Sequence, residues 1–156
     1  MARHSRAARP RVRSLVAAVL VVLGGLGTAG TAQADGAPVG GTPCTADARA
    51  CVDLAAKRAW LIDAGTVLRG PVPVSVGAPG QETPKGDFRV EWKNTYHRSA
   101  EYDGAPMPFA VFFAEGGIAF HEGGLDGPSA GCVRLGHEDA VAFYDFLEVD
   151  DPVQVR

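Results

Sequence analysis

The sequence predicts a mainly β domain with one helix near its C-terminal end. Short apolar runs bounded by Gly and Pro follow one another from residue 51 to residue 121. Residues 136–149 instead have apolar side chains at helical spacing and acids in the first turn. This apolar stripe consists of Ala140, Val141, Phe143, Tyr144 and Leu147. Residues 152–156 predict a closing strand.

The first two strand segments are predicted from apolar runs and turn residues. Residues 51–65, CVDLAAKRAWLIDAG, indicate two short strands around a turn. Residues 71–76, PVPVSV, alternate between valines on one face and Pro71, Pro73 and Ser75 on the other. Because proline cannot donate a ladder hydrogen bond, this segment should form an edge or irregular strand.

The middle of the chain predicts a further strand and a hairpin. Residues 86–93, GDFRVEWK, alternate cleanly, with Phe88, Val90 and Trp92 expected to point inward. Residues 107–121 supply two apolar runs separated by Glu-Gly-Gly, which is typical of a hairpin.

The N-terminal residues have the layout of a secretory signal peptide. Residues 1–14 carry five arginines and no acid, an apolar run follows, and TAQA ends in a small-x-small cleavage pattern. A retained membrane anchor is the alternative, but it needs about 20 apolar residues. We expect cleavage after Ala34, so that residues 1–34 are the signal peptide and residues 35–49 a flexible lead-in.

Removal of this leader changes the charge of the protein. The whole chain has a formal charge of −3, but its leader holds five of the 15 basic residues and none of the 18 acids. The remaining chain therefore has a formal charge of −8. Such a surface repels phosphate backbones, which argues against nucleic acid as a partner.

Three cysteines follow the leader. In an exported chain an odd number indicates one disulfide and one leftover thiol. Cys44 and Cys51 are close in sequence and form the natural pair, provided that the residues between them fold back as a turn. Cys132 is then free, and it could be a buried packing residue, a metal ligand or a nucleophile.

A histidine and a cysteine flank a Gly-rich loop. His121 follows an apolar run and Cys132 stands eleven residues later, so the loop can bring imidazole and thiol together. Such an arrangement lowers the pKa of a thiol and gives a nucleophile. Gly131 allows a tight turn whose N–H groups form an oxyanion hole. Arg134, the only Lys or Arg between residues 99 and 155, suits a substrate carboxylate.

These histidines and Arg134 also have other interpretations. His97 lies in a polar segment, residues 94–104, and His137 fits an early position of the helix, so the histidines show no metal-ligand spacing with Cys132. Arg134 could instead form a surface ion pair. The residue pattern favours a Cys/His acyl-transfer enzyme without a metal or organic cofactor.

Several segments together resemble a known family. TPKGDFRV, MPFAVFF, GIAFHEG and SAGCVRL, followed by an Ala-rich helix and DDPVQV, occur in the order typical of the YkuD-type L,D-transpeptidase catalytic domain. The resemblance covers residues 50–156. It implies a β-sandwich or barrel-like domain with one late helix over those residues.

The resemblance also implies roles for individual residues. Cys132 would be the nucleophile and His121 its base, with the backbone carbonyl of Glu122 orienting the imidazole. N–H groups around Gly131 and Cys132 would form the oxyanion hole.

Three further loop positions follow from the same resemblance. Ser129 and Arg134 would line the site and contact the donor stem. Ala130 stands where the family usually has a second histidine, so the contribution of that histidine is replaced or missing. The loop between His121 and Cys132 is also short, which affects the width of the cleft.

The implied protein is a secreted, cell-wall-associated monomer whose partners are peptidoglycan stem peptides. Cys132 would attack the carbonyl of the third residue of a tetrapeptide, releasing D-alanine, and an amine of a neighbouring stem would complete a cross-link. Water as acceptor would make the enzyme a carboxypeptidase. A carbapenem should form an adduct with Cys132.

The sequence leaves two alternatives of other classes open. Papain-like hydrolases of the NlpC/P60 kind place their cysteine before the histidine, whereas His121 precedes Cys132. A non-catalytic wall-binding module with a relic site is the other alternative; Ala130 favours it, and the intact Cys132, His121 and Arg134 argue against it.

Overall fold

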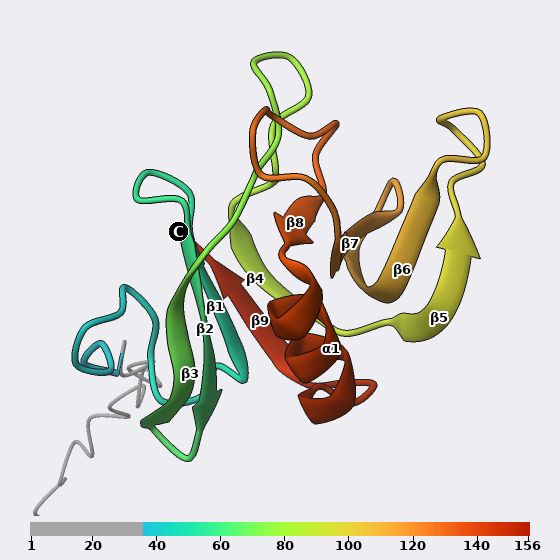
Figure 1. Ribbon diagram of the computed structural model, residues 1–156. Helices are drawn as coiled ribbons and strands as arrows, with labels where there is room; N and C mark the ends of the chain where they lie inside the picture. Colours follow the sequence, from blue (N-terminus) through green and yellow to red (C-terminus); the bar gives the residue numbers. More distant parts are fainter. Residues whose placement is uncertain (1–35) are drawn as a thin grey trace, which may run out of the picture. The chain divides into compact units, whose positions relative to one another are not determined.

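The computed structural model describes residues 36–156, which fold into two β-sheets and one α-helix (Figure 1). The predicted signal peptide lies outside the described residues. The sheets have five strands in the order β3-β2-β1-β9-β4 and four strands in the order β5-β6-β7-β8. The elements are β1 (Ala50–Asp53), β2 (Arg58–Asp63), β3 (Thr66–Pro73), β4 (Gly86–Arg89), β5 (Trp92–Arg98), β6 (Pro106–Ala114), β7 (Ile118–Glu122), β8 (Val133–Leu135), α1 (His137–Phe146) and β9 (Pro152–Val155).

The five-stranded sheet confirms several predictions. β1 and β2 are the two strands predicted around a turn, and β9 is the predicted closing strand. β9 lies between β1 and β4, parallel to the first and antiparallel to the second. β3 is an edge strand of this sheet, as the prolines indicated, but it begins at Thr66 and ends at Pro73.

The prediction of one continuous strand over residues 86–93 is wrong. β4 pairs with β9 in the first sheet, whereas β5 pairs with β6 in the second. The chain crosses between the sheets at Val90, whose N–H donates to Asp151, and Glu91, whose N–H donates to Phe112. Trp92, expected to point inward, is 41% exposed. Apolar and polar residues alternate without interruption through Val90 and Glu91, so the sequence pattern did not indicate that the chain changes sheets there.

The predicted hairpin is formed by β6 and β7. Phe109 on β6 has a φ of +54°, and its ring contacts Tyr144 and His137 of α1. Met107 and Phe112 belong to a separate apolar cluster. In a regular strand, residues an odd number of positions apart point to opposite faces. The irregular backbone at Phe109 interrupts this pattern, so that Met107 and Phe112 belong to the same cluster.

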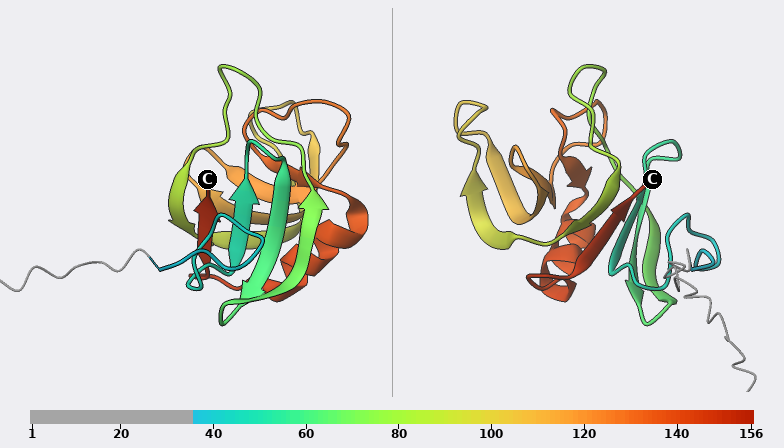
Figure 2. Two further views of the ribbon diagram at one scale, coloured as in Figure 1. Left: turned by 90° about the vertical axis from the view of Figure 1, so that its left-hand side faces the viewer. Right: turned by 180° about the vertical axis from the view of Figure 1, so that it is seen from behind.

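The helix completes a core shared by both sheets. Glu138 and Asp139 lie in its first turn, as predicted. The predicted apolar stripe is buried at Ala140, Phe143 and Leu147. These side chains belong to one apolar cluster with residues from the five-stranded and the four-stranded sheet. The fold is a two-sheet β structure with one late helix, and Figure 2 shows the sheets from two further sides.

Two long loops lie at the same end of the domain (Figures 1 and 2). Residues 74–85 follow β3, and residues 123–132 connect β7 to β8. Isolated bridges join Gly77 to Ser129 and Ser75 to Arg134. Within residues 36–156, no helix is long and apolar enough to cross a membrane.

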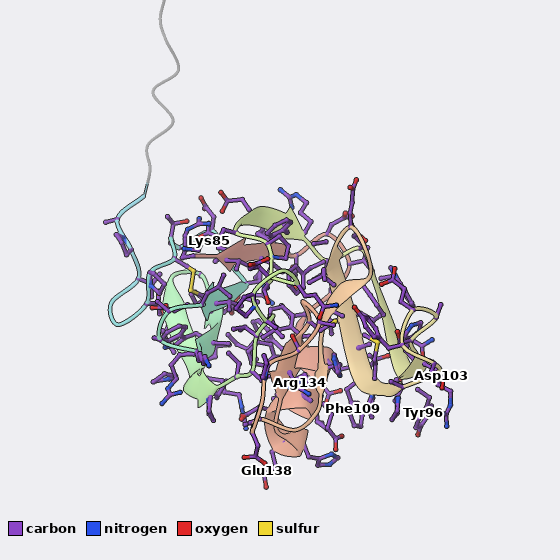
Figure 3. The ribbon with its side chains drawn as sticks, turned by 90° about the horizontal axis from the view of Figure 1, so that it is seen from above. Lys85, Tyr96, Asp103, Phe109, Arg134 and Glu138 are labelled. Carbon is purple, nitrogen blue, oxygen red and sulfur yellow. A yellow bond between two sulfur atoms is a disulfide. The ribbon has the colours of Figure 1, made fainter. Side chains whose placement is uncertain are left out.

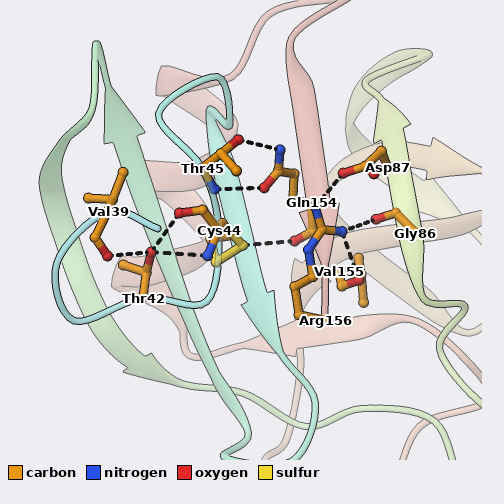
Figure 4. The surroundings of a disulfide bond; sticks show 10 residues. Val39, Thr42, Cys44, Thr45, Gly86, Asp87, Gln154, Val155 and Arg156 are labelled. Atoms are coloured by element: carbon orange, nitrogen blue, oxygen red, sulfur yellow. Dashed lines mark hydrogen bonds and ion pairs between the residues drawn. A yellow bond between two sulfur atoms is a disulfide. The ribbon is translucent and has the colours of Figure 1, made fainter. Parts of the chain in front are cut away.

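The predicted disulfide between Cys44 and Cys51 is confirmed (Figure 4). Both cysteines are fully buried. The Thr45 N–H donates to the side-chain oxygen of Gln154 at 2.9 Å, and the Gln154 amide donates back to the Thr45 hydroxyl at 2.9 Å. Because Gln154 lies on β9, these contacts and the disulfide tie the segment before β1 to the centre of the sheet.

This disulfide leads to a thiol count and a stability prediction. Alkylation should detect one thiol before reduction and three after it, since Cys132 is free. The double variant Cys44→Ser/Cys51→Ser should lower the free energy of unfolding by about 2.5 kcal/mol, because the bond closes a short loop in the unfolded chain. Urea denaturation measures the difference. Two reactive thiols in the unreduced protein would contradict the pairing.

Candidate active site

The parallel pairing of β7 with β8 brings the predicted site residues together. His121 is the register partner of Arg134, so their side chains share a face of the sheet. Cys132 stands two residues before Arg134 and continues the same face. Phe120 and Val133 are fully buried in the core on the opposite face.

His121, Cys132 and Arg134 line one pocket with a volume of about 480 Å³. Ser129, Ala130 and Glu122 lie on the same side of it, while the opposite wall comes from β5, β6 and the loop between them. The opposite wall includes Trp92, His97, Glu101, Tyr102, Met107 and Phe112. This volume falls in the ordinary range for a small-molecule site.

His121 is held in a defined orientation. Its side chain is 7% exposed, and its Nδ1 lies 2.7 Å from the backbone carbonyl oxygen of Glu122. A carbonyl can only accept, so Nδ1 carries the proton and Nε2 of the neutral ring is free to take one. The Glu122 carboxylate in turn lies 2.8 Å from Nδ1 of His137 on α1. The contact predicted for the Glu122 carbonyl is therefore present.

Burial favours the neutral forms of both His121 and Cys132 when no substrate is bound. Burial lowers the pKa of His121, and the charges of Arg134 and His97 lower it further, while the Glu122 carbonyl opposes them. Burial raises the pKa of the Cys132 thiol, against the effect of a backbone hydrogen bond at Ala119. The thiol lies 3.6 Å from the carbonyl oxygen of Gly117. The lowered thiol pKa expected from the sequence is not found, because desolvation outweighs the favourable contacts.

The turn before the cysteine is fixed by short hydrogen bonds. Gly131 has a φ of +111°, which favours glycine. Its carbonyl accepts from the buried Thr83 hydroxyl at 2.7 Å, and its N–H donates to Ser129 Oγ at 3.1 Å. Ser129 Oγ donates to the Cys132 carbonyl at 2.5 Å. Ser129 therefore shapes the cysteine loop itself, and the Gly131 N–H is engaged within it.

Arg134 has an unusual set of contacts. Its Nη2 donates to Ser75 Oγ at 3.0 Å and to the carbonyl of Gly127. Its Nε is buried without a hydrogen-bond partner among residues 36–156. No ion pair joins it to a carboxylate of the described residues, so the surface ion-pair interpretation is not supported. A guanidinium that lines a pocket without a counter-charge among the described residues suits an anionic ligand.

Sequence reasoning placed some site residues wrongly or missed them. Ser75 was predicted only to lie on the face opposite the valines, with no role in the site, but it is 4% exposed and its hydroxyl accepts a hydrogen bond from Arg134. His97 was assigned to a polar segment, but it lies on β5 with its ring 5.3 Å from Trp92 and 4.9 Å from Phe112. The Glu101 carboxylate lines the pocket and also raises the Cys132 pKa. No local signal marked these residues, because strand pairing and loop return bring them to the pocket.

No group of three or more His, Cys, Asp or Glu side chains within the described residues could hold a metal ion. The chemistry available on this chain is that of a thiol, an oriented imidazole and a guanidinium.

Residues 47–155 match the family model of the YkuD L,D-transpeptidase catalytic domain. The chain belongs to this family. The match spans the pocket and both sheets, and it confirms the resemblance given by the sequence motifs. It also rules out the papain-like alternative.

Individual L,D-transpeptidases are similar to this chain. A probable L,D-transpeptidase 3 of Mycobacterium tuberculosis is 31% identical over 108 residues, which are 56% of this chain and 39% of that protein. A solved L,D-transpeptidase of Stackebrandtia nassauensis is 29% identical, with a TM-score of 0.65, over 69% of this chain and 54% of that one. The solved L,D-transpeptidase 3 of M. tuberculosis with a faropenem-derived adduct is 22% identical, with a TM-score of 0.61, over 72% and 61%. The chain thus spans about 40 to 60% of these proteins.

The raised thiol pKa predicts how Cys132 reactivity depends on pH. Only the thiolate reacts with iodoacetamide, so a raised pKa means a smaller reactive fraction at every pH below it. The alkylation rate should be low at neutral pH and should keep increasing above the ordinary thiol pKa of about 8.5. A rate that is already constant between pH 6 and about 8 would instead indicate a preformed thiolate–imidazolium pair.

Proposed function

We propose that this domain is a secreted L,D-transpeptidase that transfers an acyl group from a tetrapeptide stem of peptidoglycan through a Cys132 thioester. The observation that supports the proposal is the convergence, in one pocket, of a free thiol, an oriented imidazole and a guanidinium that has no ion pair among residues 36–156. Membership of the L,D-transpeptidase family supports the reaction class. The signal-peptide pattern of residues 1–34 supports export to the cell wall.

Acylation begins with the attack of the Cys132 sulfur on the carbonyl of the third stem residue. The new C–S bond forms as the bond to D-alanine breaks, and the thiol proton passes to Nε2 of His121. His121 then gives this proton to the departing amine of D-alanine. The products are a thioester on Cys132 and free D-alanine, and the imidazole is neutral again.

The neutral forms of Cys132 and His121 before substrate binds determine when the proton is transferred. Because burial opposes charge on both groups, the thiolate forms only as the substrate carbonyl arrives. The thiol must also turn from the Gly117 carbonyl toward His121. The Glu122 contact keeps Nε2 as the accepting nitrogen throughout, so no tautomer change delays the transfer.

The developing oxyanion needs backbone donors. We assign it to the N–H groups of Cys132 and Gly131. The Gly131 N–H donates to Ser129 Oγ before substrate binds, so the oxyanion replaces a neutral acceptor with a charged one. Such an exchange strengthens the contact in the transition state more than in the ground state, which is the requirement for catalysis.

Arg134 binds a carboxylate of the donor stem. Its Nη2 is anchored by Ser75 and Gly127, which fixes the plane of the guanidinium in the wall of the pocket. Because the guanidinium is planar and fixed at one side, it can position the stem relative to Cys132 two residues away.

The Arg134 assignment predicts that lysine cannot replace arginine. Arg134→Lys and Arg134→Ala should both lower kcat/KM for the tetrapeptide by about 10- to 100-fold, the range for a lost charge-assisted hydrogen bond. Alkylation of Cys132 by a small neutral reagent should change much less. A Lys variant as active as wild type would show that a point charge is sufficient.

The nucleophile assignment predicts a covalent adduct. A protein of the same fold is known with a faropenem-derived adduct, and a carbapenem presents a strained amide to the same thiol. Intact mass should show one carbapenem on wild type and none on Cys132→Ser. His121→Ala should slow adduct formation by about 100-fold or more, with partial recovery at high pH, where the thiol ionises unaided.

Incubation with a disaccharide tetrapeptide tests the proposed reaction directly. Wild type should release D-alanine and transiently gain the mass of the acyl group, and the double variant Cys132→Ser/His121→Ala should lose little more activity than either single variant. An adduct that persists in Cys132→Ser would assign the nucleophile to another residue. Absence of any D-alanine release would favour a non-catalytic wall-binding role.

A further inference from the structure

We propose that Thr83 is a positioning residue for the acyl transfer, and that its hydroxyl orients the Cys132 N–H toward the developing oxyanion. This inference rests on the proposed function, since an oxyanion forms only if Cys132 attacks a carbonyl. Thr83 is the first residue of the TPKG segment, residues 83–86, and does not line the pocket. The proposed acyl transfer otherwise uses no residue of this segment.

Both hydrogen bonds of the Thr83 hydroxyl have a fixed direction. The side chain is 3% exposed, and its Oγ1 lies 3.0 Å from the backbone nitrogen of Gly77 and 2.7 Å from the carbonyl oxygen of Gly131. A backbone N–H can only donate, and a carbonyl can only accept. The hydroxyl therefore accepts from Gly77 and donates its single proton to the Gly131 carbonyl.

The peptide unit between Gly131 and Cys132 transmits this contact to the oxyanion hole. The unit is planar and trans, so the Gly131 carbonyl and the Cys132 N–H share one rigid plane and point in opposite directions. A carbonyl fixed toward Thr83 therefore fixes the Cys132 N–H away from it. A hydrogen bond to the carbonyl also polarises the peptide unit, which makes its N–H a stronger donor.

The Cys132 N–H is available to a substrate oxygen. It donates to no other residue among 36–156, whereas the Gly131 N–H donates to Ser129 Oγ. Cys132 lines the pocket and Thr83 does not, so Thr83 lies behind the cysteine loop. Figure 3 looks onto this end of the domain and shows Arg134, two residues after Cys132, near its middle. The N–H that points away from Thr83 thus points to the pocket side of the loop.

The two loops are held together by other bonds than that of the Thr83 hydroxyl. The Ala78 N–H donates to the Ser129 carbonyl at 3.0 Å, and the Ser129 N–H donates to the Val76 carbonyl at 2.9 Å. Loss of the hydroxyl should therefore leave the loops in place and release only the peptide plane before Cys132.

Two reactions of the same thiol distinguish this role from a structural one. Acylation of Cys132 by a carbapenem passes through an oxyanion, whereas alkylation by iodoacetamide needs only the thiolate. Intact mass measures both rates for wild type, Thr83→Val, which removes the hydroxyl, and Thr83→Ser, which keeps it. Thr95→Val is the matched control, because the Thr95 hydroxyl donates to Tyr144 at 3.0 Å and does not line the pocket.

We expect Thr83→Val to lower the acylation rate by about 10- to 100-fold, less than the roughly 100- to 1,000-fold cost of removing an oxyanion donor outright. Its alkylation rate should stay close to that of wild type across the pH range. D-alanine release from the tetrapeptide should decrease in parallel with acylation. Thr83→Ser and Thr95→Val should acylate almost as fast as wild type. Circular dichroism verifies folding, and Thr83→Ala, with the same expected outcome, replaces Thr83→Val if valine prevents it.

An acylation rate in Thr83→Val equal to that of wild type would overturn the inference while leaving the proposed function intact. Equal losses of acylation and alkylation, failure of Thr83→Ser to retain acylation, or the same selective loss in Thr95→Val would also overturn it. If wild type formed no adduct and released no D-alanine, the proposed function would fail, and the role of Thr83 with it.

Discussion

The parallel pairing of β7 with β8 is the constraint on which the site depends. It fixes His121 opposite Arg134 and leaves Cys132 on the same face. A slip of β8 by one residue would turn Cys132 and Arg134 into the core and bring Val133 out of it. Because Phe120 and Val133 are fully buried, the hydrophobic effect opposes such a slip. The geometry of the candidate catalytic face is therefore set by apolar side chains buried on the opposite face.

The features that could be predicted from the sequence are those determined by neighbouring residues. The Glu-Gly-Gly hairpin, the helix with its acidic first turn and the Cys44–Cys51 disulfide all have local signals, and all are present. The crossing at Val90 and the burial of Ser75 depend on which strand lies alongside, which alternation does not encode. For the same reason, the polar segment around His97 gives no local sign that this residue lines the pocket.

The ionisation of the site follows from a competition between burial and nearby charge. Arg134 favours the Cys132 thiolate and disfavours a charged His121, but desolvation is the larger effect on both groups. A Cys132 thiolate paired with a His121 imidazolium in the absence of substrate would need solvation that this buried position does not offer. In the proposed reaction, the thiolate would therefore form only at the moment of attack, where backbone donors can stabilise the developing charge. Substrate binding would then be part of nucleophile activation.

Arg134 places one positive charge in the pocket of an otherwise acidic domain. The chain after the predicted leader has a formal charge of −8, and Arg134 is the only Lys or Arg that lines the pocket. In an acidic domain a carboxylate is repelled from most of the surface, so one guanidinium with an unpaired donor attracts it to a single place. Ala130, in the position where a second histidine was expected, adds no charge on that side; the other imidazole of the pocket, His97, stands on the opposite wall. A carboxylate held by this guanidinium would lie beside Cys132, because the two residues are two positions apart on one face of the sheet. The charge that selects a ligand and the thiol proposed to react with it are therefore positioned by the same short strand.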